Sequence, residues 1–171
     1  MTEDRRAGLS RFQLTAFVAL IVATVAAFFI AQHIKVSTPL ISGAPAPFPA
    51  TINPVSGGIC YDRALRREVD HRQSSISFYL LHASDTVNVY IVNQGGAQVA
   101  TLATGRFMKA ALFPHEVATQ FTWDGRRQNG SVAPDGRYYF AVHLIHQDRT
   151  LTIASGSGPL PVTVDTRSRC P

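Results

Sequence analysis

The hydrophobic pattern of this chain begins with one long apolar run. Residues 12–31 read FQLTAFVALIVATVAAFFIA and contain no charged residue. A helix of about 20 apolar residues crosses the hydrocarbon core of a bilayer, which is about 30 Å thick. We therefore predict a transmembrane signal-anchor helix over residues 12–34. A cleaved signal peptide is the alternative, although its apolar region is usually shorter, about 7–15 residues.

Basic residues predict how this helix is oriented. Residues 1–11 contain three Arg, whereas Lys35 is the only Lys or Arg between the helix and Arg63. Short segments rich in Lys and Arg remain on the cytoplasmic side of a membrane. We expect a cytoplasmic tail over residues 1–11 and an extracytoplasmic location for everything after the helix, as in a single-pass protein of the cell membrane.

Prolines set the character of the next segment. Residues 36–54 read VSTPLISGAPAPFPATINP and contain five prolines. Proline fixes φ and lacks an N–H donor, so it disfavours helix and central strand and favours the extended polyproline II conformation. We predict a semi-rigid stalk over residues 35–54 that lifts the following domain off the bilayer.

From residue 55 onward, apolar and polar residues alternate with a period of two, which is typical of half-buried strands. Ile76, Phe78 and Leu80, for example, share one face of such a strand. Residues 63–70 are a charged segment that could form a short helical turn or a loop. The predicted strands cover residues 75–81, 86–92, 98–103, 116–123, 137–146, 150–154 and 160–165. Short strands at this spacing predict an all-β antiparallel sandwich over residues 55–171.

Two cysteines, Cys60 and Cys170, lie near the ends of this β-region. Neither has the spacing of a metal site, and cysteines outside the cytoplasm usually pair. We expect a disulfide between them that closes a loop of roughly 110 residues and stabilises the fold by about 4–5 kcal/mol in the chain-entropy model. Two independent thiols are the alternative.

The charge of the chain argues against one class of function. The formal net charge is +5 at pH 7, but the basic residues are scattered along the sequence. Nucleic-acid binding is not expected, because it needs a basic stripe or a recognisable motif. Weak attraction to anionic wall polymers or lipid headgroups is compatible with this charge.

A group of motifs in the β-region matches a known pattern. It comprises the run VNVYIVNQGGAQVATL, the tetrapeptide Trp123-Asp124-Gly125-Arg126 and the segment Pro134-Asp135-Gly136-Arg137-Tyr138. Together they resemble the immunoglobulin-like domain of bacterial flagellar hook-capping proteins and secreted proteases (FlgD/Vpr type). The resemblance covers about residues 75–166 and implies an immunoglobulin-like sandwich with an extracytoplasmic scaffold role. No flagellar assembly region or protease domain accompanies the module, so the resemblance does not imply hook capping or proteolysis.

The motif residues have a structural interpretation. Trp123 should plug one end of the sandwich, and its indole N–H needs an acceptor when buried. Asp124 can accept hydrogen bonds from the turn that follows it, and the hydroxyl of Tyr138 should reach nearby backbone. The structural signature consists of Trp123, Asp124, Gly125, Asp135, Gly136 and Tyr138.

The chain offers few groups for catalysis or metal binding. His143 and His146 are three residues apart on a predicted strand, so they face opposite sides and are poor joint ligands. The segment Ser155-Gly156-Ser157-Gly158 lacks the strand-to-helix context of a nucleophile. Asp124 and Asp135 are typical of ordinary Asp-Gly turns rather than of a calcium loop. We therefore expect no enzymatic activity, no catalytic residue, no metal and no cofactor.

The connection over residues 106–115, RFMKAALFPH, is longer and more apolar than the resemblance implies. If exposed, its apolar residues would mark a partner site. Alternatively, the segment caps one open edge of the sandwich. The candidate patch consists of Phe107, Met108, Leu112 and Phe113.

These features together indicate a non-catalytic module at the bacterial envelope that acts as a structural or adhesive scaffold. The expected partners are the lipid bilayer, through residues 12–34, and an unidentified envelope protein or a wall or glycan polymer. An alternative is an accessory subunit that docks onto an envelope enzyme, a transporter or a secretion apparatus.

Overall fold

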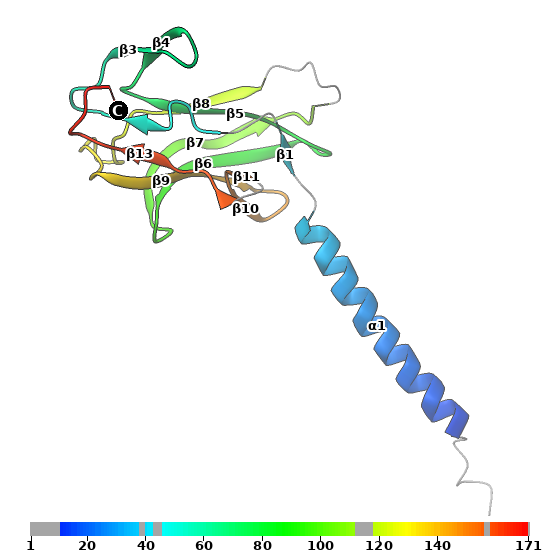
Figure 1. Cartoon of the computed structure of the whole chain (residues 1–171). Coiled ribbons are helices and arrows are strands. Elements are labelled where there is room, and N and C mark those ends of the chain that lie inside the picture. The colour runs from blue at the N-terminus through cyan, green and yellow to red at the C-terminus, as the bar shows by residue number, and fades with distance from the viewer. Residues whose placement is uncertain (1–10, 38–39, 43–45, 112–117, 156–157, 171) are drawn as a thin grey trace, which may run out of the picture. The chain divides into compact units, whose positions relative to one another are not determined.

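The computed structural model describes residues 11–37, 40–42, 46–111, 118–155 and 158–170. The chain divides into two compact units, Met1–Pro39 and Leu40–Pro171. In the first unit, helix α1 spans Arg11–Ser37 (Figure 1). Its segment Leu14–Ala31 is long and apolar enough to cross a membrane, and none of it is buried. This is compatible with a membrane anchor or with a signal sequence.

The second unit is a β-sandwich, whose strands are labelled in Figure 1. One sheet has the order β1-β5-β8, and its strands are Ile41–Ser42, Ser74–Leu80 and Thr119–Trp123. The other sheet has the order β2-β13-β9-β6-β7, and β10 also pairs with β9. Its strands are β2 (Thr51–Ile52), β13 (Val162–Val164), β9 (Gly136–Leu144), β6 (Asp85–Asn93), β7 (Gln98–Met108) and β10 (Arg149–Thr152). The hairpins β3–β4 (Ile59–Asp62 and Arg67–Asp70) and β11–β12 (Ala154–Ser155 and Gly158–Pro159) lie outside these sheets.

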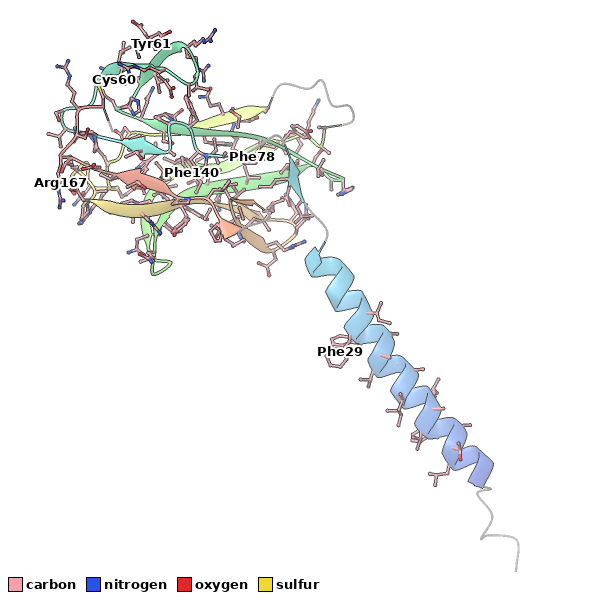
Figure 2. All side chains as sticks on the ribbon, viewed as in Figure 1. Phe29, Cys60, Tyr61, Phe78, Phe140 and Arg167 are labelled. Carbon is pink, nitrogen blue, oxygen red and sulfur yellow. A yellow bond between two sulfur atoms is a disulfide. The ribbon has the colours of Figure 1, made fainter. Side chains whose placement is uncertain are left out.

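The core lies between the two sheets and follows the alternation of the sequence. Every second residue of β5 is buried, from Ser74 to Leu80. The ring of Phe78 stacks on that of Phe121 in the neighbouring strand, with 5.3 Å between the ring centroids. From the opposite sheet, Phe140 joins the same core cluster and is fully buried (Figure 2). The prediction of an antiparallel immunoglobulin-like sandwich preceded by one helix is confirmed.

The prediction of a stalk over residues 35–54 is wrong, because most of this segment belongs to the sandwich. Ile41 pairs with Leu80 of β5, and Thr51 pairs in parallel with Thr163 of β13. The segment therefore starts in one sheet and continues in the other, and its residue Ile52 is fully buried. The prolines of this segment interrupt neither sheet, because β1 and β2 contain none of them and are edge strands, each with a partner on one side only. The β-domain begins at Leu40 rather than at residue 55.

The charged segment over residues 63–70 is neither a helical turn nor a simple loop. It forms the turn after β3 and the strand β4, so that Cys60 pairs with Val69 and Tyr61 with Glu68. Val69 is buried, whereas Glu68 is exposed. The segment thus has the period-two pattern of a hairpin, although its single buried side chain gives only a weak apolar signal.

Candidate interaction surface at the disulfide end of the domain

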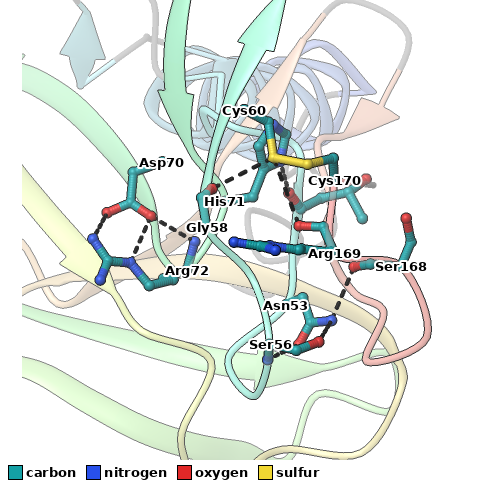
Figure 3. The surroundings of a disulfide bond; sticks show 11 residues. Asn53, Ser56, Gly58, Cys60, Asp70, His71, Arg72, Ser168, Arg169 and Cys170 are labelled. Carbon is teal, nitrogen blue, oxygen red and sulfur yellow. Dashed lines mark hydrogen bonds and ion pairs between the residues drawn. A yellow bond between two sulfur atoms is a disulfide. The ribbon is translucent and has the colours of Figure 1, made fainter.

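The two cysteines meet at one end of the sandwich, which we call the disulfide end (Figure 3). Cys60 of β3 and Cys170 near the C-terminus form a disulfide with 5.9 Å between their Cα atoms. The predicted pairing is confirmed. The bond ties the β3–β4 hairpin to the last residues of the chain, which stand 110 positions later in the sequence.

Asn53 forms a hydrogen-bond centre beneath the disulfide (Figure 3). Its side chain is fully buried. The amide nitrogen Nδ2 donates to Ser56 Oγ and to the carbonyl of Ser168, both at 2.9 Å, and Oδ1 accepts from the backbone N–H groups of Val55 and Ser56, also at 2.9 Å. Its backbone N–H donates to the carbonyl of His71 at 2.8 Å. One side chain therefore joins the turn after β2 to the C-terminal segment, and its backbone joins both to the end of β4.

Replacing Asn53 by Ala should lower the free energy of unfolding by about 2–3 kcal/mol, because several partly buried backbone groups would lose their only partner. Urea unfolding of the detergent-solubilised chain measures this loss. Asn129→Ala is a matched control, since Asn129 also accepts a backbone hydrogen bond, from Ser131 at 3.0 Å, but is exposed. Equal losses for the two variants would contradict the central role of Asn53.

Strand β3 of the β3–β4 hairpin presents two apolar side chains to solvent, and Leu65 in the turn is also exposed. Ile59 and Tyr61 are two residues apart on β3 and so lie on the same face, where they are 62% and 64% exposed. Cys60 and Val69 occupy the opposite face, which packs toward the domain. Figure 2 shows Tyr61 at the outer end of this hairpin. We call the surface formed by Ile59 and Tyr61 the hairpin face.

Polar contacts hold the hairpin in place. The guanidinium of Arg67 lies 5.0 Å from the ring centroid of Phe48, a cation–π contact with the segment between β1 and β2. Arg72 Nη2 lies 2.7 Å from Asp70 Oδ2 and Arg72 Nε 2.9 Å from Oδ1, which lowers the pKa of the Asp70 carboxyl. The hairpin face is therefore an exposed apolar surface on an anchored element.

The structural signature does not contribute to the hairpin face, because its two large side chains, Trp123 and Tyr138, are buried. Trp123 is 1% exposed, and its Nε1–H donates to the carbonyl of Arg126 at 2.8 Å. Asp124 Oδ1 accepts from the backbone N–H of Arg126 at 3.0 Å. The hydroxyl of Tyr138 donates to the carbonyl of Pro134 at 2.7 Å, and its ring centroid lies 5.1 Å from that of Trp123.

The glycines and Asp135 of the signature serve the turns. Gly125 has a φ of 75°, and a Cβ at this position would lie 2.8 Å from Cγ of Pro54. Only glycine satisfies both the left-handed conformation and this close approach. Gly136, with a φ of 156°, begins strand β9. Asp135 Oδ1 accepts from the backbone N–H and the hydroxyl of Thr166, and these bonds lower the pKa of its carboxyl.

The predicted apolar patch in residues 106–115 is divided by the fold. Phe107 is 62% exposed, but Met108 is 5% exposed and belongs to the core. Adjacent residues of a strand face opposite sides, so the two side chains cannot form one surface, and including Met108 in the patch was wrong. Leu112 and Phe113 lie outside the described residues.

One buried carboxylate lies at the opposite end of the domain. Asp85 is 1% exposed, and it accepts hydrogen bonds from the backbone N–H of Thr86 at 2.6 Å and of His146 at 2.9 Å. His146 Nδ1 lies 2.7 Å from the same oxygen. Burial alone would raise the pKa of this carboxyl, but the hydrogen bonds from His146, Thr86 and Gln147 outweigh burial and hold the pKa below its ordinary value.

This lowered pKa predicts a loss of stability in acid. A carboxyl whose pKa is lower in the folded than in the unfolded state stabilises the fold above the unfolded value, about 3.9, and the stabilisation is lost as pH falls through the folded value. At neutral pH, Asp85→Asn should cost roughly 1.5–3 kcal/mol, because the charge-assisted hydrogen bonds disappear. Urea unfolding from pH 7 to pH 3 should show this cost shrinking toward the acid end. A cost that does not change with pH would contradict the assignment.

Among the residues that the structure describes, no three His, Cys, Asp or Glu side chains come together in a group that could hold a metal ion. His143 Nδ1 lies 3.0 Å from Thr150 Oγ1, whereas His146 contacts Asp85. The two histidines thus have separate structural partners.

Sequence reasoning missed the hairpin face. It singled out residues 106–115 because their apolar character was unexpected, whereas Ile59 and Tyr61 form a short apolar stretch directly before a charged segment. The available signal was Cys60, because a cysteine that forms a disulfide fixes its two neighbours on the opposite face of the strand.

Comparison with known families supports the resemblance found in the motifs. Residues 64–148 match the family model of the FlgD Ig-like domain. The matched segment runs from the turn of the β3–β4 hairpin to the turn after β9, and the recognition from sequence is confirmed. No curated protein matches the chain at a significant level.

Proposed function

We propose that the protein is a non-catalytic scaffold of the bacterial envelope, because residues 64–148 match the family model of the FlgD Ig-like domain, which suggests a structural module. Helix α1 anchors it in the cell membrane with the N-terminus in the cytoplasm, and the Ig-like domain acts outside as a structural or adhesive element. The observation that carries this proposal is the combination, in one chain, of an apolar helix and a disulfide-closed domain. Disulfides persist in oxidising compartments, which favours the extracytoplasmic side for the domain.

The location is tested in cells that produce the full chain. The protein should stay in membranes washed with alkaline carbonate, and protease added to spheroplasts should remove the β-domain while leaving the membrane-embedded segment. Cys60 and Cys170 should resist alkylation until a reductant is added. A mature chain that begins after the apolar run, identified by N-terminal sequencing, would show a secreted protein instead of an anchored one.

A second candidate function is that of an accessory subunit bound to an envelope protein. The hairpin face favours it, since Ile59 and Tyr61 are large apolar side chains held on an anchored hairpin. Such residues bind well in an apolar pocket of a protein partner. A wall or glycan polymer would instead be expected to use polar contacts along with any aromatic platform.

A photo-crosslinking amino acid in place of Tyr61 distinguishes these candidates. If the hairpin face docks onto a protein, Tyr61 should give one discrete protein adduct in intact cells, and Ile59→Ser should abolish it. Phe107 is the matched control, because it is equally exposed but lies on β7. The same adduct from both positions, or no adduct from Tyr61, would contradict the accessory function. Binding of the Ile59→Ser variant to purified wall material would favour adhesion through another surface.

A further inference from the structure

The β-domain begins at Leu40, three residues after α1 ends at Ser37, so the end of the domain that contains Leu40 follows the helix most closely along the chain. We propose that this end, which we call the Leu40 end, rests on the lipid headgroups, with Phe107 and Lys109 as its contacts to the bilayer surface. The inference depends on the membrane anchoring proposed above, and it replaces the predicted stalk by direct contact between the domain and the lipid.

The distance to the bilayer is limited by covalent geometry. Helix α1 ends at Ser37, and Leu40 is already part of the domain, since it is 8% exposed and its carbonyl accepts the N–H of Leu81 at 2.8 Å. Three peptide units of about 3.8 Å each therefore allow at most about 11 Å between these two Cα atoms. This limit holds for every orientation of the domain.

The helix itself adds little height. Its apolar segment ends at Ala31, and the six residues from there to Ser37 rise by about 9 Å. The headgroup layer on each side of a bilayer is roughly 5–8 Å thick, from a total of about 40–45 Å and a core of about 30 Å. Leu40, where the domain begins, is therefore held within a short distance of the headgroups.

Strand register identifies the other residues at the Leu40 end. Leu80, the partner of Ile41, also forms a bridge with Ala110. The N–H of Ala110 donates to Ser84 Oγ at 2.9 Å, just before the start of β6. The last residues of β7 and the first residues of β6 thus lie at the same end of the sandwich as Leu40.

Among the described residues, two exposed apolar side chains stand at this end. Thr86 of β6 pairs with Phe107 of β7, and the carbonyl of Thr86 accepts the N–H of Ile145 after β9. Phe107 is 62% exposed and Ile145 is 42% exposed. The remaining strongly exposed apolar side chains among the described residues of the domain, including Ile59 and Tyr61, belong to the N-terminal segment and the β3–β4 hairpin, away from this end.

The charges at the Leu40 end suit an anionic lipid surface. Lys109 is an exposed cation two residues after Phe107, whereas the guanidinium of Arg106 lies 5.4 Å from the ring centroid of Phe121. Among the described residues of this end, Asp148 is an exposed carboxylate in the turn after β9, and Asp85 is buried and bonded to His146. Lysine side chains beside aromatic rings are typical of the membrane interface, and exposed cations near anionic lipids are attracted to them.

The test places a tryptophan at each end of the domain in turn. Full-length Phe107→Trp and Tyr61→Trp are reconstituted in vesicles of phosphatidylcholine and phosphatidylglycerol, with and without bromine on the acyl chains. Both positions are similarly exposed, at 62% and 64%, and the buried Trp123 contributes the same background to both. A side chain seated about 5–10 Å into the headgroup boundary lies within reach of brominated chains, so the added emission of Phe107→Trp should be blue-shifted and largely lost, whereas that of Tyr61→Trp should be unchanged.

Each other outcome overturns the proposal. If neither added tryptophan is quenched, the domain stands off the bilayer; if both are quenched equally, the domain lies along the surface instead of on its Leu40 end. A charge variant gives a second readout, since Lys109→Glu should reduce the quenching of Phe107→Trp in vesicles with phosphatidylglycerol but not in pure phosphatidylcholine, and Arg63→Glu in the hairpin turn should have no effect.

The position of the domain on the bilayer and the anchoring in cells are tested separately. Flotation of the vesicles shows whether the full chain is inserted, before any fluorescence is read. An anchor that is cleaved in cells would contradict the proposed function, yet the quenching pattern of the intact chain would still report where the domain lies.

Discussion

Replacing Cys60 and Cys170 together by Ser is expected to lower the free energy of unfolding by about 4–5 kcal/mol in the chain-entropy model. The bond joins residues that are 110 positions apart, and without it the unfolded chain gains the freedom that this large loop denies. Domains of this size are stable by only about 5–15 kcal/mol, so the loss should be visible as a large fall in melting temperature of the detergent-solubilised chain.

Two controls accompany this prediction. Wild-type protein in the presence of a reductant should unfold like the double variant, because both lack the same constraint. Tyr61→Ser changes the residue next to Cys60, but its side chain is exposed, so it should leave stability within about 0.5 kcal/mol of wild type. A loss below about 1 kcal/mol in the double variant would mean that the loop-closure account fails here and that contacts such as the Asn53–Ser168 hydrogen bond hold the C-terminal segment by themselves.

The strands of the sandwich could be predicted because their signal is local. In β5, β6 and β9, a buried residue alternates with a half-buried one over most of the strand, and this period is read directly from the sequence. The turn residues were also readable, since Gly125 and Gly130 mark reversals with φ values of 75° and 80°. The disulfide followed from the expected compartment.

The N-terminal part of the domain could not be predicted from local composition. Ile52 and Asn53 are fully buried, but the contacts that bury them come from β13 and from Ser168, more than 100 residues later. Prolines around them are typical of an extended linker, and an edge strand that crosses between sheets tolerates the same residues. Whether such a segment is a linker or an edge strand depends on its partner strand, which lies more than 100 residues away in the sequence.

The candidate site was missed for a related reason. Ile59, Cys60 and Tyr61 form an apolar run of only three residues, which is too short to show an alternation, and the charged residues after them are typical of a loop. Conversely, Phe107 and Met108 form an apolar pair in sequence, but consecutive strand residues face opposite sides. The exposure of a surface residue is therefore decided by strand register, which the sequence contains only where an alternation is long enough to read.

Trp123→Ala is expected to lower the free energy of unfolding by about 3–5 kcal/mol, the range for deleting a large aromatic side chain from a core. Trp123 is 1% exposed, it lies against the ring of Tyr138, and its Nε1–H binds the carbonyl of Arg126. Trp123→Phe retains an aromatic ring but loses this hydrogen bond, so a smaller loss of roughly 1–2 kcal/mol is expected. Because Trp123 is the only tryptophan, urea unfolding should be followed by far-UV circular dichroism.

Phe107→Ala is the control for the predicted stability losses of the Trp123 variants. It also removes an aromatic ring, but from a position that is 62% exposed, and surface substitutions usually change stability by less than about 0.5 kcal/mol. If Trp123→Ala cost no more than Phe107→Ala, the tryptophan would not be a core residue, and the motif around it would have to be explained by binding instead of by folding. The expected large difference would show that the Trp-Asp-Gly motif closes the sandwich, which leaves the hairpin face and the Leu40 end as the surfaces through which the domain meets its surroundings.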